Sequence, residues 1–278
     1  MLGRPVTNAL INAGFEVSVL ARNSGKAKQL FPAASIQWGD VLDPISMLAA
    51  FEGTDAIYIS LQAPRGARQH QPLPEREGMA NILSAAKVTG IGRIAYLSSL
   101  VKQYNHTNGF HWWVLDMKQA AVDQIKSSGI PYTLFYPSTF MESFDGILRQ
   151  GNKIMLAGNS RVPMHFIAAA DYAQQVVHSF NILTTENKEY PVQGPEAWNW
   201  DDGAHIFIDH YPHAALKILK TPLGLLKFAG HFNRTIQYGA KIVEAMNNYP
   251  EKFESEKTWQ ELGKPVITIA DYAAGLAP

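Results

Sequence analysis

EVSVLARNSGKAKQLFPAASIQWGDVLDPISMLAAFEGTDAIYISL, residues 16–61, alternates short apolar runs with segments of helical character. Three of its segments have the alternating or β-branched apolar pattern of strands: 16–22, 35–40 and 55–61. Asn23 or Ser24 can cap the helix after the first strand, and Asp43 with Pro44 is typical of the start of the next helix. The stretch therefore predicts strand, helix, strand, helix, strand.

The same alternation extends in both directions from this stretch. Before it, Val6, Leu10 and Ile11 recur near helical spacing, and Gly14 stands where that helix would end. After it, the pattern predicts helices at 75–89 and 110–129 and strands at 93–100 and 131–137. Strands separated by helices of this length form right-handed βαβ units with helices on both faces. The predicted fold class is α/β with a doubly wound parallel sheet.

The pattern is less regular in the second half of the chain. Its segments predict a strand leading into a helix capped by Asp171, another strand and helix, one amphipathic helix, and a final strand with a helical turn: 165–180, 187–211, 222–248 and 266–275. We assign residues 1–140 to the sheet core. Residues 141–278 are expected to complete the core edge and form a smaller, mostly helical lobe.

Composition and charge exclude several classes of protein. Lys plus Arg and Asp plus Glu are both 24, so no overall basic field favours nucleic acid or an anionic membrane. The absence of cysteine excludes disulfides and thiolate chemistry and is typical of a reducing compartment. No apolar run is long enough for a membrane span, and the first residues lack a secretory pattern. We expect a cytoplasmic protein whose partner is a small molecule or another protein.

Charged residues end two successive predicted strands. Arg22 and the nearby Lys26 stand where a dinucleotide fold meets the adenosine ribose; an acid there favours a free 2′-hydroxyl, whereas Arg accommodates a 2′-phosphate. Asp40 follows the next strand and can accept a hydrogen bond from the adenine amino group. A solvated strand-end arginine and an ordinary Gly-Asp turn are the alternatives. Together the residues favour NADP over NAD.

Several segments taken in order resemble one protein family: LGRPVTNALINAGFEVSVLARN, GDVLDPISMLAAFEGTDAIYIS, RIAYLSS, KQAAVDQIKSSGIPYTLFYPSTFMES, FIAAADYAQQVV and YPVQGPEAW. The series, which covers about residues 1–200, resembles the NmrA-like branch of the atypical short-chain dehydrogenase/reductase superfamily. Relatives include isoflavone-reductase-like and quinone-reductase-like enzymes and NADP-binding redox sensors without demonstrated turnover. The resemblance implies a Rossmann-like sheet ordered 3-2-1-4-5-6-7, with NADP(H) across the strand ends and substrate beneath the C-terminal lobe.

The resemblance also implies which residues contact NADP(H). Gly3 matches the last glycine of the family's G-x-x-G-x-x-G, and Arg22 and Asp40 match the 2′-phosphate and adenine contacts. The remaining matched positions follow Gly3 on the first helix or lie at the ends of the fourth, fifth and sixth family strands: Arg4, Leu61, Gln62, Ala63, Ser98, Ser99, Pro137 and Ser138.

The catalytic position departs from the commoner short-chain pattern, in which Lys lowers the pKa of a catalytic Tyr in Tyr-x-x-x-Lys. Val114 stands four residues before Lys118, and the chain has no Tyr-x-x-x-Lys, so we do not expect the tyrosine mechanism. In isoflavone-reductase-like relatives the proposed acid/base is a lysine eleven residues before the glycine of GIPYT; Lys118 has that spacing to Gly129. The resemblance implies that Lys118 transfers a proton or binds the nicotinamide ribose. An exposed helix lysine is the alternative.

Aromatic residues at the start of the helix 110–129 are candidates for a substrate pocket. His111, Trp112 and Trp113 could stack on a flat substrate such as a quinone, or the tryptophans could pack under the small lobe. Phe140 and His165 are further candidates to line the pocket.

The histidines of HIFIDHYPH, namely His205, His210 and His213, have irregular spacing and no matching carboxylate or cysteine, so we expect no metal site. Our leading functional hypothesis is an NADP-dependent oxidoreductase that passes hydride to a small carbonyl, quinone or enone, with Lys118 assisting the proton. The alternative is a non-catalytic protein that senses NADP(H) and reports it to a partner.

The chain opens on the helix that follows the glycine-rich loop in this family. By analogy with the family's βα unit, roughly ten to twelve residues of strand and glycine-rich loop would precede Leu2. A start assigned to an internal methionine is our preferred explanation; a truncated gene product and a clipped chain are the alternatives. We expect the chain as written to bind NADP weakly, because the first two glycines of the pyrophosphate cradle are lacking.

Overall fold

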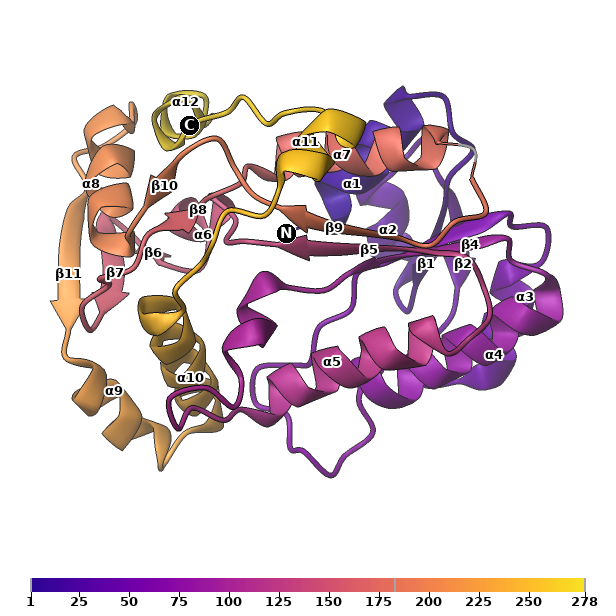
Figure 1. Cartoon of the computed structure of the whole chain (residues 1–278), viewed down its shortest axis with the longest axis horizontal. Helices are drawn as coiled ribbons and strands as arrows, with labels where there is room; N and C mark the ends of the chain where they lie inside the picture. Colours follow the sequence, from indigo (N-terminus) through magenta and orange to yellow (C-terminus); the bar gives the residue numbers. More distant parts are fainter. Residues whose placement is uncertain (1, 183, 278) are drawn as a thin grey trace.

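Parallel strands form the centre of the computed structural model, which describes residues 2–182 and 184–277 (Figure 1). One sheet has the order β3-β4-β5-β9 and consists of Ala56–Ile59, Arg93–Leu97, Tyr132–Pro137 and Lys188–Val192. A second parallel pair consists of β1 (Ser18–Ala21) and β2 (Ser35–Trp38), with Ser18 in register with Ser35. Within the four-stranded sheet the order is that expected for family strands 4 to 7, and β1 and β2 pair with each other as expected for family strands 2 and 3.

Helices cover both faces of the parallel strands, as expected for a doubly wound fold. They are α1 (Gly3–Asn12), α2 (Ser24–Leu30), α3 (Pro44–Phe51), α4 (Met79–Thr89), α5 (Trp113–Lys126) and α7 (Ala169–Asn181). In Figure 1, α3, α4 and α5 lie on one side of the strands, and α1 and α7 lie on the other. The predicted α/β fold is therefore confirmed in this part of the chain.

Side-chain alternation along the central strands builds a core on each face. In β4, Ile94 and Tyr96 join the cluster beneath α4 and α5, while Ala95 and Leu97 join the cluster beneath α1 and α7. Successive residues of a strand point to opposite faces, so a strand covered on both sides is apolar throughout. This is why RIAYL reads as a continuous apolar run after its first residue.

Residues 141–277 add a lobe with more strand than expected. Its elements are α6 (Glu142–Asp145), β6 (Arg149–Gln150), β7 (Lys153–Ala157), β8 (Met164–His165), β10 (Ala197–Trp198), α8 (Trp200–His210), β11 (Lys217–Thr221), α9 (Leu223–Gly230), α10 (Arg234–Asn248), α11 (Glu256–Leu262) and α12 (Ile269–Ala274). β11, β7 and β6 form a three-stranded sheet, and β8 pairs with β10. Among the described residues, no helix is long and apolar enough to cross a membrane.

Three predictions for this part of the chain were wrong. The amphipathic segment 222–248 is two helices rather than one, because Asn233 accepts hydrogen bonds from the amides of Thr235 and Ile236 and caps α10. Asp171 does not cap α7; it lies in the first turn and accepts from Val266 and Ile267.

Residues 266–268 form no strand, because Thr268 caps α12 in a capping box with Asp271. Helix boundaries earlier in the chain also differ from those predicted. The predicted helix 110–129 begins at Trp113, since Trp112 has an extended backbone. Residues 74–78 precede α4 as a π-helical turn, η1 (Pro74–Gly78), and η2 (Leu100–Tyr104) follows β4.

The side chain of Glu142 makes stability depend on pH. One carboxylate oxygen accepts from the amide of Ala169 at 2.8 Å, and the other is buried with no hydrogen-bond partner among the described residues. Burial raises the pKa of Glu142 above its ordinary value. The folded state therefore binds the proton more tightly than the unfolded chain, so this group lowers stability as pH rises from the ordinary carboxyl pKa through the raised pKa.

We expect Glu142→Gln to unfold at a higher urea concentration than the wild type near pH 8. At about pH 3, well below the ordinary carboxyl pKa, both side chains are uncharged and the two proteins should have similar midpoints. Urea unfolding followed by circular dichroism at both pH values measures the difference. If Glu142→Gln shifted the urea midpoint by the same amount and in the same direction at both pH values, the raised pKa of Glu142 would be contradicted.

Candidate functional site

Lys118 lies on α5 and forms an ion pair with a buried carboxylate. Its Nζ is 2.6 Å from Glu75 Oε1, and the exposed side-chain fractions are 16% for Lys118 and 0% for Glu75. The other carboxylate oxygen of Glu75 accepts from the amide of Ala63 at 2.9 Å, just beyond the end of β3. Lys118 is therefore not an exposed helix lysine: its ammonium is held beside the strand ends.

Glu75 is a site residue that sequence reasoning missed. It lies in the π-helical turn η1, among the residues PEREG, where an acid ahead of a helix looks like an ordinary solvated N-terminal charge. Tyr96 Oη is also buried, without a hydrogen-bond partner in the described part of the chain. Burial first, and then the charge of Glu75, raises the pKa of Tyr96 well above its usual range. The Tyr96 phenol beside the ion pair is thus uncharged.

Ser98 and Ser138 follow β4 and β5 and differ in their hydrogen bonds. Ser98 Oγ is buried and, within residues 2–182 and 184–277, has no hydrogen-bond partner. Ser138 Oγ instead donates to Glu251 Oε2 at 2.6 Å. An unpaired buried hydroxyl is costly unless a ligand or water satisfies it, so Ser98 fits a ligand at the strand ends. The Ser138 hydroxyl is already used within the protein; neighbouring Pro137 is buried, and Ser99 is half-buried.

Glu251 is a second residue that the sequence did not reveal. Its side chain is fully buried; it accepts from the His165 amide at 3.1 Å and from Gln193 Nε2 at 2.7 Å, and it lies 3.2 Å from His165 Nδ1. His165 therefore belongs to a cluster that joins the C-terminal segment to the ends of β5 and β9. Phe140 packs edge-on against Tyr172, with ring centroids 5.5 Å apart.

Arg22 and Asp40 are brought together, as their positions on successive strand ends predicted. Arg22 Nη1 is 3.7 Å from Asp40 Oδ2, and the arginine side chain is 78% exposed. The other oxygen of Asp40 accepts from the amide of Leu42 at 3.0 Å. Lys26 is exposed on α2. An anion on Arg22 would therefore compete with Asp40, an interaction that the separate predictions had not included.

The remaining predicted cofactor residues lie at the start of α1 and after β3. Gly3 and Arg4 form the first turn of α1, whose Val6 and Leu10 pack beneath α7. After β3, Leu61 is half-buried, Ala63 is buried, and Gln62 donates through Nε2 to the hydroxyl of Tyr238 at 3.2 Å. The cofactor roles of these residues stay predictions.

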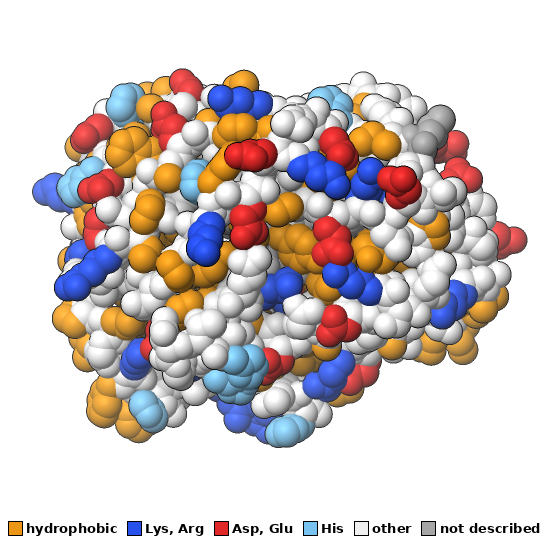
Figure 2. Space-filling model, in the orientation of Figure 1, with side chains coloured by type: hydrophobic (Ala, Val, Ile, Leu, Met, Phe, Trp, Pro, Cys, Tyr) orange, Lys and Arg blue, Asp and Glu red, His pale blue; other side chains and the backbone are white. Residues whose placement is uncertain are grey.

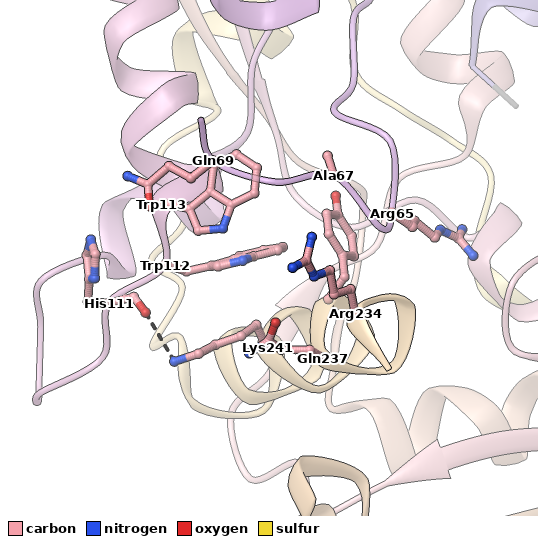
Figure 3. Close-up of a pocket in the computed structure, with 10 residues that line it drawn as sticks. Arg65, Ala67, Gln69, His111, Trp112, Trp113, Arg234, Gln237 and Lys241 are labelled. Carbon is pink, nitrogen blue, oxygen red and sulfur yellow. Dashed lines mark hydrogen bonds between the residues drawn. The ribbon is translucent and has the colours of Figure 1, made fainter. Parts of the chain in front are cut away.

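An aromatic cleft of about 270 Å³ lies beside this region (Figure 3). The residues that line it come from the loop after β3, the start of α5 and one face of α10: Arg65, Ala67, Gln69, His111, Trp112, Trp113, Arg234, Gln237, Tyr238 and Lys241. Three of the five predicted pocket residues therefore share one cleft. Phe140 and His165 do not line it, because they pack at the α7 face and on Glu251 respectively.

His106, His111 and Asp116 form a group that could hold a metal ion, with one ligand atom of each within 4.8 Å of the others. Each histidine Nε2 is 2.7 Å from a different oxygen of Asp116. Burial raises the pKa of Asp116, but hydrogen bonds from both histidines outweigh it, and the net pKa lies below its usual value. The sequence had drawn attention to different histidines, His205, His210 and His213. Of these, His210 directs Nδ1 to the backbone carbonyl of Ile206.

Comparisons with known proteins agree with the fold of the sheet. Residues 1–181 match the model of a family described as NAD(P)H-binding. The photosystem II assembly factor Ycf39 of Guillardia theta is 26% identical over 253 residues, which is 88% of this chain and 78% of that protein. Quinone oxidoreductase 2 of Escherichia coli (strain K12) is 25% identical over 206 residues, covering 71% and 66%.

A solved structure extends the likeness of the fold to almost the whole chain. Triphenylmethane reductase of Citrobacter sp., complexed with NADP(H), aligns with a TM-score of 0.75 at 19% identity and covers 98% of this chain and 96% of that one. The Rossmann-like fold is thereby confirmed. Because the family model spans more than half of the sequence, the chain belongs to the NAD(P)H-binding family.

Proposed function

We propose that the protein is an NmrA-like, NADP(H)-dependent reductase of a small carbonyl, quinone or enone, in which Lys118 assists proton transfer. The observation that supports this most directly is the Lys118–Glu75 pair, a shielded ammonium fixed at the strand ends of an NAD(P)H-binding fold. A relative named quinone oxidoreductase agrees with the proposed substrate class. NADPH, when bound, supplies hydride.

The residues around Lys118 can guide a proton to the reduced substrate. An ammonium has three donors, and Glu75 occupies one of them, so two remain for a substrate oxygen or a ribose hydroxyl. A substrate oxygen that gains negative charge during reduction would take a proton from Nζ. The 16% exposure of the side chain gives solvent a route to replace that proton. Glu75 itself is held by Ala63, so the pair keeps its position.

The cofactor residues fit NADP(H) through Arg22, Asp40 and Ser98. Arg22 would hold the 2′-phosphate at the end of β1, Asp40 would accept from the adenine amino group, and the unpaired Ser98 hydroxyl would donate to a group at the end of β4. Assays should use excess NADPH and compare each variant with the wild type.

Arg22→Ala should raise the KM for NADPH about tenfold and leave the KM for NADH nearly unchanged. In the proposed complex the guanidinium would hold the 2′-phosphate, which NADPH carries and NADH lacks, and a hydrogen bond to a charged group contributes about 1.5–3 kcal/mol, less where it is exposed. Steady-state kinetics with both cofactors measure the effect, with Lys87→Ala on the exposed side of α4 as the control. Equal losses with NADPH and NADH would refute the 2′-phosphate role.

A second candidate function is a binding protein that senses NADP(H) and contacts a protein partner. Relatives named photosystem II assembly factors match 88% of the chain, which favours a role outside catalysis. Apolar side chains also gather at the corner formed by α9 (Figure 2), where Phe232 is 81% exposed and Phe228 63%. Stoichiometric NADPH consumption with a panel of quinones and aldehydes supports the reductase; cofactor binding without consumption supports the sensor.

A further inference from the structure

One face of α10 forms a wall of the aromatic cleft. Arg234, Gln237, Tyr238 and Lys241 follow the spacing i, i+3, i+4, i+7 and therefore project from the same side of the helix. Such a stripe is usually apolar and faces a core. Here it carries two cations, an amide and a phenol, so this wall of the cleft is polar and positively charged.

The facing wall is aromatic and fixed in place. Trp112 is buried and packs its ring edge-on against Tyr238, with centroids 4.8 Å apart and planes at 76°. Lys241 Nζ donates to the carbonyl of His111 at 3.1 Å and lies 4.9 Å from the centre of the Phe110 ring. Figure 3 shows Arg234 and Lys241 reaching from α10 toward the two tryptophans. Aromatic surface and positive charge thus face the same space.

The charge of the cleft differs from that of the whole molecule. The chain has equal numbers of basic and acidic residues, 24 of each. The residues lining the cleft include Arg65, Arg234 and Lys241 and no carboxylate. Asp116, on the first turn of α5, directs its two oxygens to His106 and His111. A cleft lined by one sign of charge against low-dielectric walls concentrates ligands of the opposite charge.

The cleft also adjoins the Lys118 site. Tyr238 accepts a hydrogen bond from Gln62, which follows β3. Ala67 and Trp113 pack against Ala63 and Met117. The amide of Ala63 donates to Glu75, and Met117 directly precedes Lys118 in the sequence. Neither Lys118 nor Glu75 lines the cleft, so a ligand there would lie one layer of residues away from the pair that would guide the proton.

We propose that this cleft binds planar aromatic compounds that carry an acidic group, such as a sulfonate or carboxylate, and that such compounds are the preferred substrates. The flat part of the ligand would stack on the half-buried Trp113, and its acidic group would pair with Arg234 and Lys241. The volume of about 270 Å³ suits a ligand of one or two rings. The substrate part of this inference rests on the proposed reductase function.

The test compares two quinones of similar shape and different charge. Calorimetric titration of the full chain, without cofactor and at low salt, should give at least tenfold tighter binding for 1,4-naphthoquinone-2-sulfonate than for uncharged 2-methyl-1,4-naphthoquinone. The preference should shrink as salt is added, because charge pairing at the cleft mouth is screened. The chain has no cysteine, so neither quinone can form a thiol adduct.

The double variant Arg234→Gln/Lys241→Gln should lose the preference for the sulfonate and keep its affinity for the uncharged quinone, which also shows that the cleft is folded. Lys227→Gln, on α9 and paired with Glu244, is the control and should keep the preference. Equal binding of both quinones by the wild type, or an unchanged preference in the double variant, would overturn the proposal.

Turnover separates this proposal from the proposed reductase function. Selective binding of the sulfonate without NADPH consumption would retain the cleft as a binding site and overturn the reductase and the substrate assignment. NADPH consumption with both quinones at equal kcat/KM, together with equal affinities, would retain the reductase and overturn the charge selection.

Discussion

Lys118→Met should lower kcat for quinone reduction by about 10²–10⁴-fold at saturating NADPH, the range expected when a positioned acid is removed. Methionine keeps much of the aliphatic stem of Lys118 and removes the ammonium that faces the strand ends. The KM for the quinone should change little if the cleft, rather than Lys118, holds the aromatic ring. NADPH oxidation followed by absorbance at several quinone concentrations separates kcat from KM.

Two further variants show whether such a loss is chemical. Lys126→Met, on the same helix, removes a lysine that pairs with Glu189 and is 38% exposed, so it should keep wild-type activity. Lys118→Met alone leaves Glu75 buried and unpaired, which also destabilises the protein. The double variant Glu75→Gln/Lys118→Met should regain stability and stay inactive. A stable double variant with near wild-type kcat would exclude proton transfer by Lys118.

The regular half of the fold could be predicted because its signals are local. Asp43 caps α3 and Pro44 opens it, as the residues themselves indicate. The strands of the core are buried on both faces, so their apolar runs are visible without knowing their neighbours. β7 and β11 were missed because each finds its partner far along the chain: Lys153 lies in register with Lys217.

The residues of the candidate site could likewise be predicted only where the signal is local in the sequence. Arg22 and Asp40 were predicted together because parallel strands of a βαβ unit end at the same edge of the sheet. The Ser138–Glu251 hydrogen bond joins residues 113 positions apart, and no pattern in the sequence links them. Glu75 was missed because its complete burial depends on how the π-helical turn packs against α5 and the loop after β3.

Glu75→Ala should lower the free energy of unfolding by about 3–5 kcal/mol, the cost typical of breaking a buried ion pair. The change leaves the amide of Ala63, itself buried, without its acceptor and leaves Lys118 with 16% exposure and no counter-charge. Glu75→Gln keeps the carbonyl oxygen and the shape of the side chain, so it should cost less. Urea unfolding of the three proteins at one pH measures these differences.

The comparison of single and double variants tests whether the two charges act as a unit. Lys118→Met strands a fully buried carboxylate, whereas Glu75→Gln strands a lysine that still reaches solvent, so we expect the lysine change to cost more. In the double variant the losses should be smaller than their sum, with a coupling of about 1–3 kcal/mol. Glu52→Ala, at an exposed helix end, is the control and should cost under about 0.5 kcal/mol. Strictly additive losses would mean that Glu75 stabilises the fold independently of Lys118, and Glu75 could then not be the residue that holds the ammonium in place.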